Sequence, residues 1–293
     1  MTEIEFMNKR KIFFVVSLSL FLVSVVLMVV RGLNLGLDFT GGTLIQVSFN
    51  DNVSIENVRK MLSESGIKGF DVQNIILAEK NKREYIIRVK GSQEHRDKLG
   101  SEIRDIFNSK NLSYEILRVE YVGPTIGRHL TKQTLYAIIF SLIGIIVYVG
   151  IRFKSSIWGV AGVVALFHDV VITLGFLTLL QREITVTVIA ALLTLIGYSI
   201  NDTIVIFDRI RENLYLIRKE TLDRIMNRSI NQMITRTLLT TFTTFGAVFM
   251  LFILGNEVIK DFALTLVFGV MIGTYSSIYI ASALVLEYKT YVK

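Results

Sequence analysis

An apolar run from residue 184 to residue 207 is long enough to cross a lipid bilayer, and it carries an aspartate, Asp202, near its far end. A membrane-spanning helix needs about 20 mostly apolar residues, and an ionised carboxylate within it costs at least about 2.5–3.5 kcal/mol. The residues that precede Asp202 at helical spacing are small or polar: Thr187, Ala191, Thr194 and Tyr198. We therefore expect Asp202 to face this stripe rather than lipid, and to mark an ion path. The alternative is a buried acid that is hydrogen-bonded for packing alone.

The whole chain has the composition of a membrane protein. Hydrophobic residues make up 52% of it, and the charged residues, 19% of the chain, must be concentrated outside the apolar runs. The net charge of +7 is carried by short segments beside these runs, without the basic stripe interleaved with aromatics that is typical of nucleic-acid binding. Because the chain has no cysteine, disulfides and cysteine-based metal sites are excluded. The six apolar runs predict an α-helical polytopic membrane protein with spans at 12–30, 133–151, 156–180, 184–207, 233–254 and 260–286, the last five lying within 131–287.

Basic residues beside the spans predict the orientation of the chain, since cytoplasmic segments are rich in Lys and Arg. With six spans, all the basic segments fall on one side: Lys9–Lys11, Arg152 with Lys154, the segment 208–232, and Lys289 with Lys293. We therefore expect a cytoplasmic N-terminus (1–11), a cytoplasmic C-terminus (288–293) and a basic cytoplasmic loop at 208–232 that contains an amphipathic surface helix. The first span has no evident cleavage site and is expected to be a retained anchor.

Residues 31–130 have the composition of a soluble domain and are expected outside the cytoplasm. Alternating apolar residues predict strands, and helical stripes such as Ile55, Val58, Met61 and Leu62 predict helices. The expected elements are strand 43–49, helix 54–65, strand 70–78, strand 83–90, helix 93–108 and strand 112–122, with a turn at Asn81-Lys82. This βαββαβ order predicts an α+β ferredoxin-like domain between the first two spans.

Three further charged positions in or beside the spans are candidates for ion coupling. Arg236, near the start of the fifth span, shares a helical stripe with Thr240, Thr243 and Thr244; the alternative is an arginine that snorkels to the membrane surface. Asp169, in the middle of the third span, is either a relay or an interhelical hydrogen-bond partner. Its neighbour His168 is expected to point about 100° away round the helix and to be structural. Asp208 is expected to form a solvated ion pair with Arg209.

Asp202 and Arg236 are both expected in the cytoplasmic halves of their spans and can lie at similar depth if these spans are neighbours. Burial disfavours the charged form of a carboxyl group, and a nearby guanidinium favours it. An acid held between these two effects can change its protonation when helix packing changes. The sequence has no P-loop, GxSxG or metal-ligand cluster, so we do not expect an enzyme, and work must come from a partner or an ion gradient.

Five segments of the chain resemble the SecF family of protein-export membrane subunits, which pair with SecD in the bacterial Sec machinery. They occur in the family's order: LGLDFTGGT (35–43), VGPTIG (122–127), ALFHDV (165–170), GYSINDTIVIFDRIREN (197–213) and SINQMITRTLLTTFTTF (229–245). The residues singled out as the family signature are Gly36, Asp38, Phe39, Gly41, Gly42, Gly123, Pro124, Asn201 and Thr203. The resemblance covers essentially the whole chain.

The resemblance implies a proton-driven device of the resistance–nodulation–division superfamily in the bacterial inner (cytoplasmic) membrane. SecD would supply six further spans about a pseudo-two-fold axis, and the complex would use the proton motive force to help preproteins complete translocation. By motif position Asp202 is implied as the proton carrier and Arg236 as its partner, while Asp169 and Asp208 match positions of less certain role. The implied partners are SecD, the SecYEG channel, SecA, YajC, YidC, the translocating preprotein and membrane lipid, with no nucleic acid. No cofactor or metal is implied, and the transported ion is a proton, with sodium as the alternative.

In the resulting hypothesis, protonation of Asp202 from the outer side breaks its pair with Arg236 and the helices repack. Glycine-rich tethers at 32–42 and 123–127 then tilt the outer domain while it holds an emerging chain. One rival function is a passive subunit that stabilises the Sec channel. A proton-driven exporter of small molecules or lipids is disfavoured, since twelve spans in one chain would be expected of it.

Overall fold

The computed structural model describes residues 4–50, 52–67, 69–74, 83–89, 96–153, 156–217 and 219–291. Its contacts divide the chain into two units, one of residues 35–135 and the other of residues 1–34 and 136–293. Parts of what the sequence predicts lie outside the described residues, among them the Asn81-Lys82 turn and three basic residues: Lys154, Lys293 and Arg218 of the segment 208–232.

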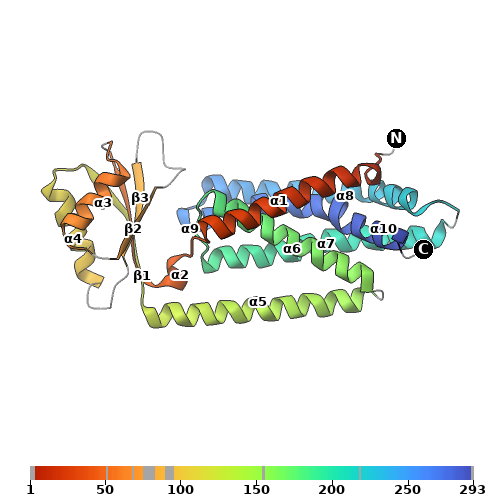
Figure 1. Cartoon of the computed structure of the whole chain (residues 1–293), viewed down its shortest axis with the longest axis horizontal. Coiled ribbons are helices and arrows are strands. Elements are labelled where there is room, and N and C mark those ends of the chain that lie inside the picture. The colour runs from red at the N-terminus through yellow and green to blue at the C-terminus, as the bar shows by residue number, and fades with distance from the viewer. Residues whose placement is uncertain are drawn as a thin grey trace. The chain divides into compact units, whose positions relative to one another are not determined.

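The smaller unit contains a four-stranded antiparallel sheet with strand order β2-β3-β1-β4 (Figure 1). Its elements are, in chain order, α2 (Leu37–Thr40), β1 (Gly42–Phe49), α3 (Ile55–Glu64), β2 (Phe70–Asn74), β3 (Arg83–Val89), α4 (Arg96–Ser109) and β4 (Tyr114–Val122). The strands and two longer helices follow the predicted order. Where the ends of these elements are described, their bounds differ from the predicted ones by one or two residues. Residues 93–95 of the predicted second helix and residues 75–78 of the second strand lie outside the described residues.

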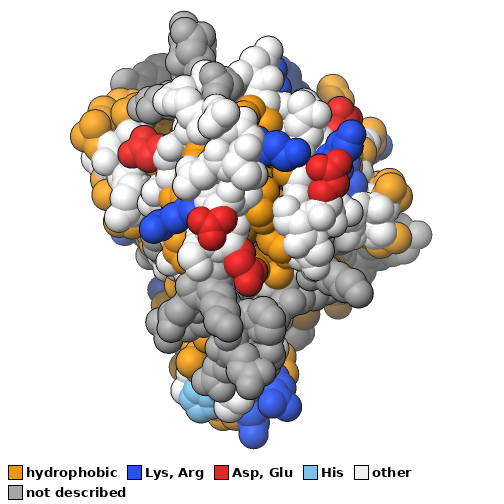
Figure 2. Space-filling view, turned by 90° about the vertical axis from the view of Figure 1, so that its left-hand side faces the viewer, with side chains coloured by type: hydrophobic (Ala, Val, Ile, Leu, Met, Phe, Trp, Pro, Cys, Tyr) orange, Lys and Arg blue, Asp and Glu red, His pale blue; other side chains and the backbone are white. Residues whose placement is uncertain are grey.

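Both longer helices pack against one face of this sheet. The side chain of Ser54 accepts a hydrogen bond from the backbone N–H of Asn57 and so begins α3. The helix then buries Val58, Met61 and Leu62 against alternate residues of the central strand. On the outer side of the helices acidic and basic side chains are interspersed (Figure 2). The helical stripe predicted from the sequence is therefore the face of α3 that is buried in this core.

Replacing Phe49 by alanine is expected to destabilise this unit by about 3–5 kcal/mol, the usual cost of emptying a buried phenylalanine site. The Phe49 ring is fully buried and contacts three other rings, those of Tyr85, Phe107 and Tyr114. The measurement is the urea dependence of proteolysis within residues 35–135 of the membrane-embedded protein. Leu117→Ala, at a position 45% exposed, is the matched control. Equal protease resistance of the two variants would contradict this description of the core.

The larger unit is a bundle of helices. Its elements are α1 (Arg10–Arg31), α5 (Pro124–Arg152, beginning in the smaller unit), α6 (Ser156–Leu179), α7 (Val186–Leu216), α8 (Leu222–Leu254), α9 (Glu257–Ser276), the π-helical turn η3 (Ser277–Ala281) and α10 (Ser282–Tyr291), after a short 3-10 turn at Met7–Lys9. In the described part of the chain six helical segments are long and apolar enough to cross a membrane, and the last runs through η3. The protein is a multi-pass membrane protein.

The basic segment 208–232 differs from the prediction of a loop with a separate surface helix. It consists mainly of the continuation of α7 to Leu216 and the beginning of α8 at Leu222. Its apolar residues Ile210, Met226 and Ile230 join the core cluster of the larger unit. Ion pairs within one helix turn, such as Arg209 with Glu212, accompany the extension of α7. Of the apolar residues that predicted the surface helix, Met226 lies in this cluster and Leu214 and Leu222 pack against it, so they belong to α7 and α8 and not to a separate helix.

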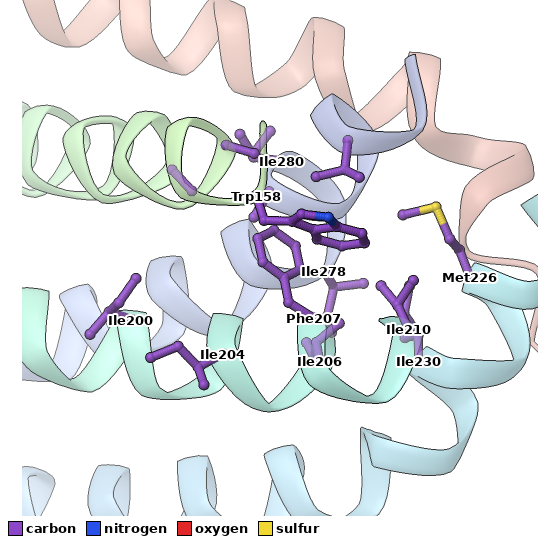
Figure 3. Close-up of a cluster of buried hydrophobic side chains, with 14 of the residues drawn as sticks. Trp158, Ile200, Ile204, Ile206, Phe207, Ile210, Met226, Ile230, Ile278 and Ile280 are labelled. Carbon is purple, nitrogen blue, oxygen red and sulfur yellow. The ribbon is translucent and has the colours of Figure 1, made fainter. Parts of the chain in front are cut away.

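The largest core cluster of the bundle lies among α6, α7, the start of α8 and the last span (Figure 3). Trp158 packs edge-on against Phe207, with ring centroids 4.9 Å apart. Isoleucines of α7 and η3 surround these two rings (Figure 3). In contrast, α1, α5 and α8 expose most of their apolar side chains. The central helices α6, α7 and α9 therefore form the frame in which polar groups can be buried.

Candidate ion-coupling site

Asp202 lies on α7, a helix that begins where the Thr185 side chain accepts a hydrogen bond from the Val188 N–H. The Asp202 side chain is buried, and the residue is only 4% exposed. Its Oδ2 atom has no hydrogen-bond partner among the described residues. A carboxylate in a membrane span requires compensation. Asp202 is therefore a buried acid, and among the described residues no hydrogen bond to Oδ2 offsets the cost of burying its charge.

Arg236 lies on α8, next to α7, and its side chain is exposed. Within the described residues no hydrogen bond or ion pair joins Arg236 to Asp202. Contacts between α7 and α8 set the antiparallel register, with Tyr198 donating to Thr241 at 3.1 Å and Arg209 donating to Gln232 at 2.6 Å. Moving one helical turn from the first contact brings Asp202 to the level of residue 237. The structure thus brings Asp202 and Arg236 to similar depth without contact.

No hydrogen bond joins the threonines of the predicted Arg236 stripe to α7 among the described residues. The hydroxyls of Thr240 and Thr243 donate to carbonyls of their own helix instead. Threonines of the next stripe, Thr237 and Thr241, are turned inward, and the Thr237 hydroxyl is buried without a partner among the described residues. A shift of one residue turns a side chain by about 100°, so Thr241, which contacts α7, lies beside the predicted stripe and not on it.

Asp169 is the most deeply buried acid of the bundle that the structure describes, at 1% exposure. Its Oδ2 accepts hydrogen bonds from the hydroxyls of Ser199 on α7 at 2.6 Å and of Ser276 at the end of α9 at 2.8 Å. Its Oδ1 lies 3.0 Å from Nδ1 of His168. The prediction that His168 points away from Asp169 was wrong, because rotation about the side-chain bonds brings neighbouring long side chains together. Asp169 therefore links three helices.

A second hydroxyl contact lies beside this acid. Thr203 of α7 and Ser277, the first residue of the π-helical turn η3, have their hydroxyl oxygens 2.9 Å apart. Ser277 also donates to the Gly273 carbonyl, and Ser282 donates to the carbonyl of Ser277 five residues earlier. π-helical turns inside α-helices are frequent at functional sites. Sequence reasoning missed Ser199, Ser276 and Ser277; their one signal is the presence of hydroxyls in otherwise apolar spans.

Asp208 does not pair with Arg209 as predicted. It contacts Arg152 of α5 and lies 3.9 Å from Arg211, whereas Arg209 pairs with Glu212. Adjacent helical residues diverge by about 100°, which explains the change of partners. Asp208 is partly exposed at the helix ends, apart from the buried acids.

The glycine-rich segments at 35–43 and 122–127 meet within the smaller unit. Gly41 has φ +65°, a backbone conformation that favours glycine, and an added Cβ would lie 3.3 Å from the Val122 carbonyl oxygen. At Gly127 an added Cβ would lie 3.5 Å from the carbonyl of Asp38 and the backbone nitrogen of Gly41. The other signature positions of these segments lie alongside, at the cap of α2 (Gly36), in α2 itself (Phe39), at the start of β1 (Gly42) and before or at the start of α5 (Gly123, Pro124). Asn201, by contrast, is exposed on α7.

Comparison with known proteins identifies the family. The model of the C-terminal part of the protein-export membrane proteins SecD and SecF matches residues 102–291, and that of the SecD/SecF GG motif matches residues 26–53. Proteins named protein translocase subunit SecF are similar over nearly the full chain. The one from Endomicrobium trichonymphae is 41% identical (98% of this chain, 92% of the relative), and that from Vibrio alginolyticus is 44% identical (97% and 89%).

Solved structures agree. The crystal structure of SecDF from Thermus thermophilus, described as a translocon-associated membrane protein, has a TM-score of 0.86 and 38% identity. The alignment covers 98% of this chain and 39% of the SecDF chain. A second SecDF structure, in a super-membrane-facing form, has a TM-score of 0.71. The chain therefore belongs to the SecD/SecF family of protein-export membrane proteins and, within it, to the SecF subunits.

Proposed function

We propose that this chain is a subunit of the bacterial Sec protein-export machinery that, with a SecD partner, uses the proton motive force to promote late steps of preprotein translocation. The observation that carries the proposal is the buried Asp202 carboxyl group, which lies in a membrane span and has no hydrogen-bond partner at Oδ2 among the described residues. Because no hydrogen bond occupies this oxygen, the carboxyl group can take up and release a proton there. Asp202 binds the proton, and Arg236 provides a nearby positive charge.

The expected partner is a SecD chain in the same membrane. This chain spans 39% of the SecDF chain it resembles, and the apolar faces of α1, α5 and α8 are exposed. Contiguous apolar surface on a membrane helix faces lipid or another helix. We assign part of this surface to SecD and the rest to lipid. SecYEG, SecA, YajC, YidC and the preprotein itself complete the proposed partners.

The proposed setting is the bacterial inner membrane, with both termini cytoplasmic and residues 31–130 outside. Basic residues at the helix ends support this orientation. The proposed outer domain is ferredoxin-like, which is supported by its βαββαβ order and antiparallel β2-β3-β1-β4 sheet. Its role is to hold an emerging chain differently in the two states of the bundle.

The test is preprotein translocation into inverted membrane vesicles that contain SecD and either contain or lack this chain, with ATP present throughout. A proton gradient, a sodium gradient or no gradient is imposed. We expect the chain to increase translocation only with the proton gradient. Stimulation by the sodium gradient alone would show that the coupling ion is sodium and not the proton. Equal stimulation without any gradient would favour the passive stabilising subunit.

Removing the charge of Arg236 is expected to weaken coupling, because a positive charge near Asp202 favours its ionised form. Arg236→Gln should lose most gradient-dependent translocation, whereas Arg236→Lys should retain part of it. The measurement is the same vesicle assay at matched protein abundance. Arg128→Gln, at an exposed position of α5 in the smaller unit, is the control. Full coupling in Arg236→Gln would remove Arg236 from the proposed mechanism.

A further inference from the structure

We infer that Asp169 is a positioning residue, which clamps α7 to the last span and so fixes the direction in which Asp202 points. This inference rests on the proposed function, because it takes Asp202 as the proton carrier. It assigns no proton transport to Asp169. The clamp consists of Asp169, Ser199 and Ser276, together with the neighbouring pair Thr203 and Ser277.

The two contacts on α7 flank Asp202. Ser199 lies three residues before it and Thr203 one residue after it, and residues four apart share one face of a helix. Both hydroxyls are held by the last span, directly or through Asp169. A helix tied at two successive turns on one face cannot rotate about its axis. Rotation by one residue would turn Asp202 through about 100°.

Close packing holds the same two helices in register. An added Cβ at Gly273 would lie 3.1 Å from Cβ of Ser199 and 3.7 Å from Oδ2 of Asp169. At Gly269, one turn away, it would lie 2.6 Å from the Leu195 side chain. The Gly269/Gly273 pair therefore lets α9 approach α7 closely enough for the short serine bonds.

The clamp needs a hydrogen-bond acceptor at position 169, and asparagine can provide one. Its carbonyl oxygen can replace Oδ2 toward Ser199 and Ser276, and its amide can donate to Nδ1 of His168. Nε2 of His168 has no partner among the described residues, so moving the imidazole proton there breaks no existing hydrogen bond. Alanine removes all three contacts and leaves the Ser199 hydroxyl without its bond to the clamp. A proton carrier would instead fail equally with asparagine and alanine.

The experiment compares Asp169→Asn, Asp169→Ala and Asp202→Asn in the vesicle assay, each at matched abundance. Clamp geometry is measured separately by iodine cross-linking of a Thr203→Cys/Ser277→Cys pair. The chain has no other cysteine, and the two hydroxyls are 2.9 Å apart. We expect Asp169→Asn to keep coupling and cross-linking, and Asp169→Ala to lose both. The double variant Ser199→Ala/Ser276→Ala tests the clamp with Asp169 present and should also lose both.

Loss of coupling in Asp169→Asn with cross-linking intact would overturn the inference, because the carboxyl group itself would then be needed. Retention of coupling and cross-linking in Asp169→Ala or in the serine double variant would also overturn it. Full coupling in Asp202→Asn would instead contradict the proposed function. The cross-linking series would still test the clamp in that case.

Discussion

Replacing Asp202 by asparagine is expected to abolish the gradient-dependent part of preprotein translocation and to leave the ATP-dependent part unchanged. Asparagine has nearly the same shape as aspartate but cannot take up or release a proton. Because Oδ2 of Asp202 has no hydrogen-bond partner among the described residues, the substitution breaks no contact there. The expected loss is therefore specific to coupling. It is measured in inverted vesicles containing SecD, with and without a proton gradient.

Two variants control this prediction. Asp202→Glu keeps the carboxyl group and should retain part of the coupling. Glu212→Gln makes the same change of carboxylate to amide on the same helix, at an exposed ion pair with Arg209. Exposed pairs contribute about 0–1 kcal/mol, so this variant should match the parent. If Asp202→Asn translocates as well as the parent with the gradient present, the proton path lies elsewhere or the subunit is passive.

The second large effect is expected at Gly175 of α6, where α1 packs most closely. An alanine Cβ there would overlap both Cβ and Oγ of Ser24 and would lie 2.7 Å from its Cα. The last of these atoms belongs to the backbone, so a change of rotamer cannot relieve the overlap and α1 must move away from α6. Overpacking of this kind costs about 1–3 kcal/mol. We expect Gly175→Ala to lower the thermal unfolding temperature of the detergent-solubilised protein.

Gly246→Ala on α8 is the control for this substitution, because nothing lies within 4 Å of the added Cβ. It should match the parent or be slightly more stable, since alanine favours helix over glycine by about 1 kcal/mol. Adding Ser24→Gly to Gly175→Ala should restore stability only in part, because the overlap with the backbone of α1 remains. An unchanged unfolding temperature in Gly175→Ala would show that α1 does not pack here as described.

The ion-coupling residues divide into those that sequence periodicity placed and those that it did not. The stripe on α7 correctly turned Asp202 away from lipid, although Thr194 of the same stripe is exposed. Helical periodicity could not distinguish the stripe of Arg236 from the neighbouring stripes of α8. In the structure the neighbouring residues Thr237 and Thr241 are the ones turned inward. The serines around Asp169 could not be predicted, because Ser199 and Ser276 are 77 residues apart and lie on different helices.

The amino-acid sequence by itself determined the six spans, the order of strands and helices in the smaller unit, and the buried position of Asp202. These follow from hydrophobic length and periodicity, which depend on neighbouring residues alone. Only the tertiary structure decided that α7 and α8 continue through the basic segment, that His168 contacts Asp169, and that Ser277 begins a π-helical turn joined to Thr203. Each of these depends on which helix faces which, and the direction of a helix face changes by about 100° with every residue.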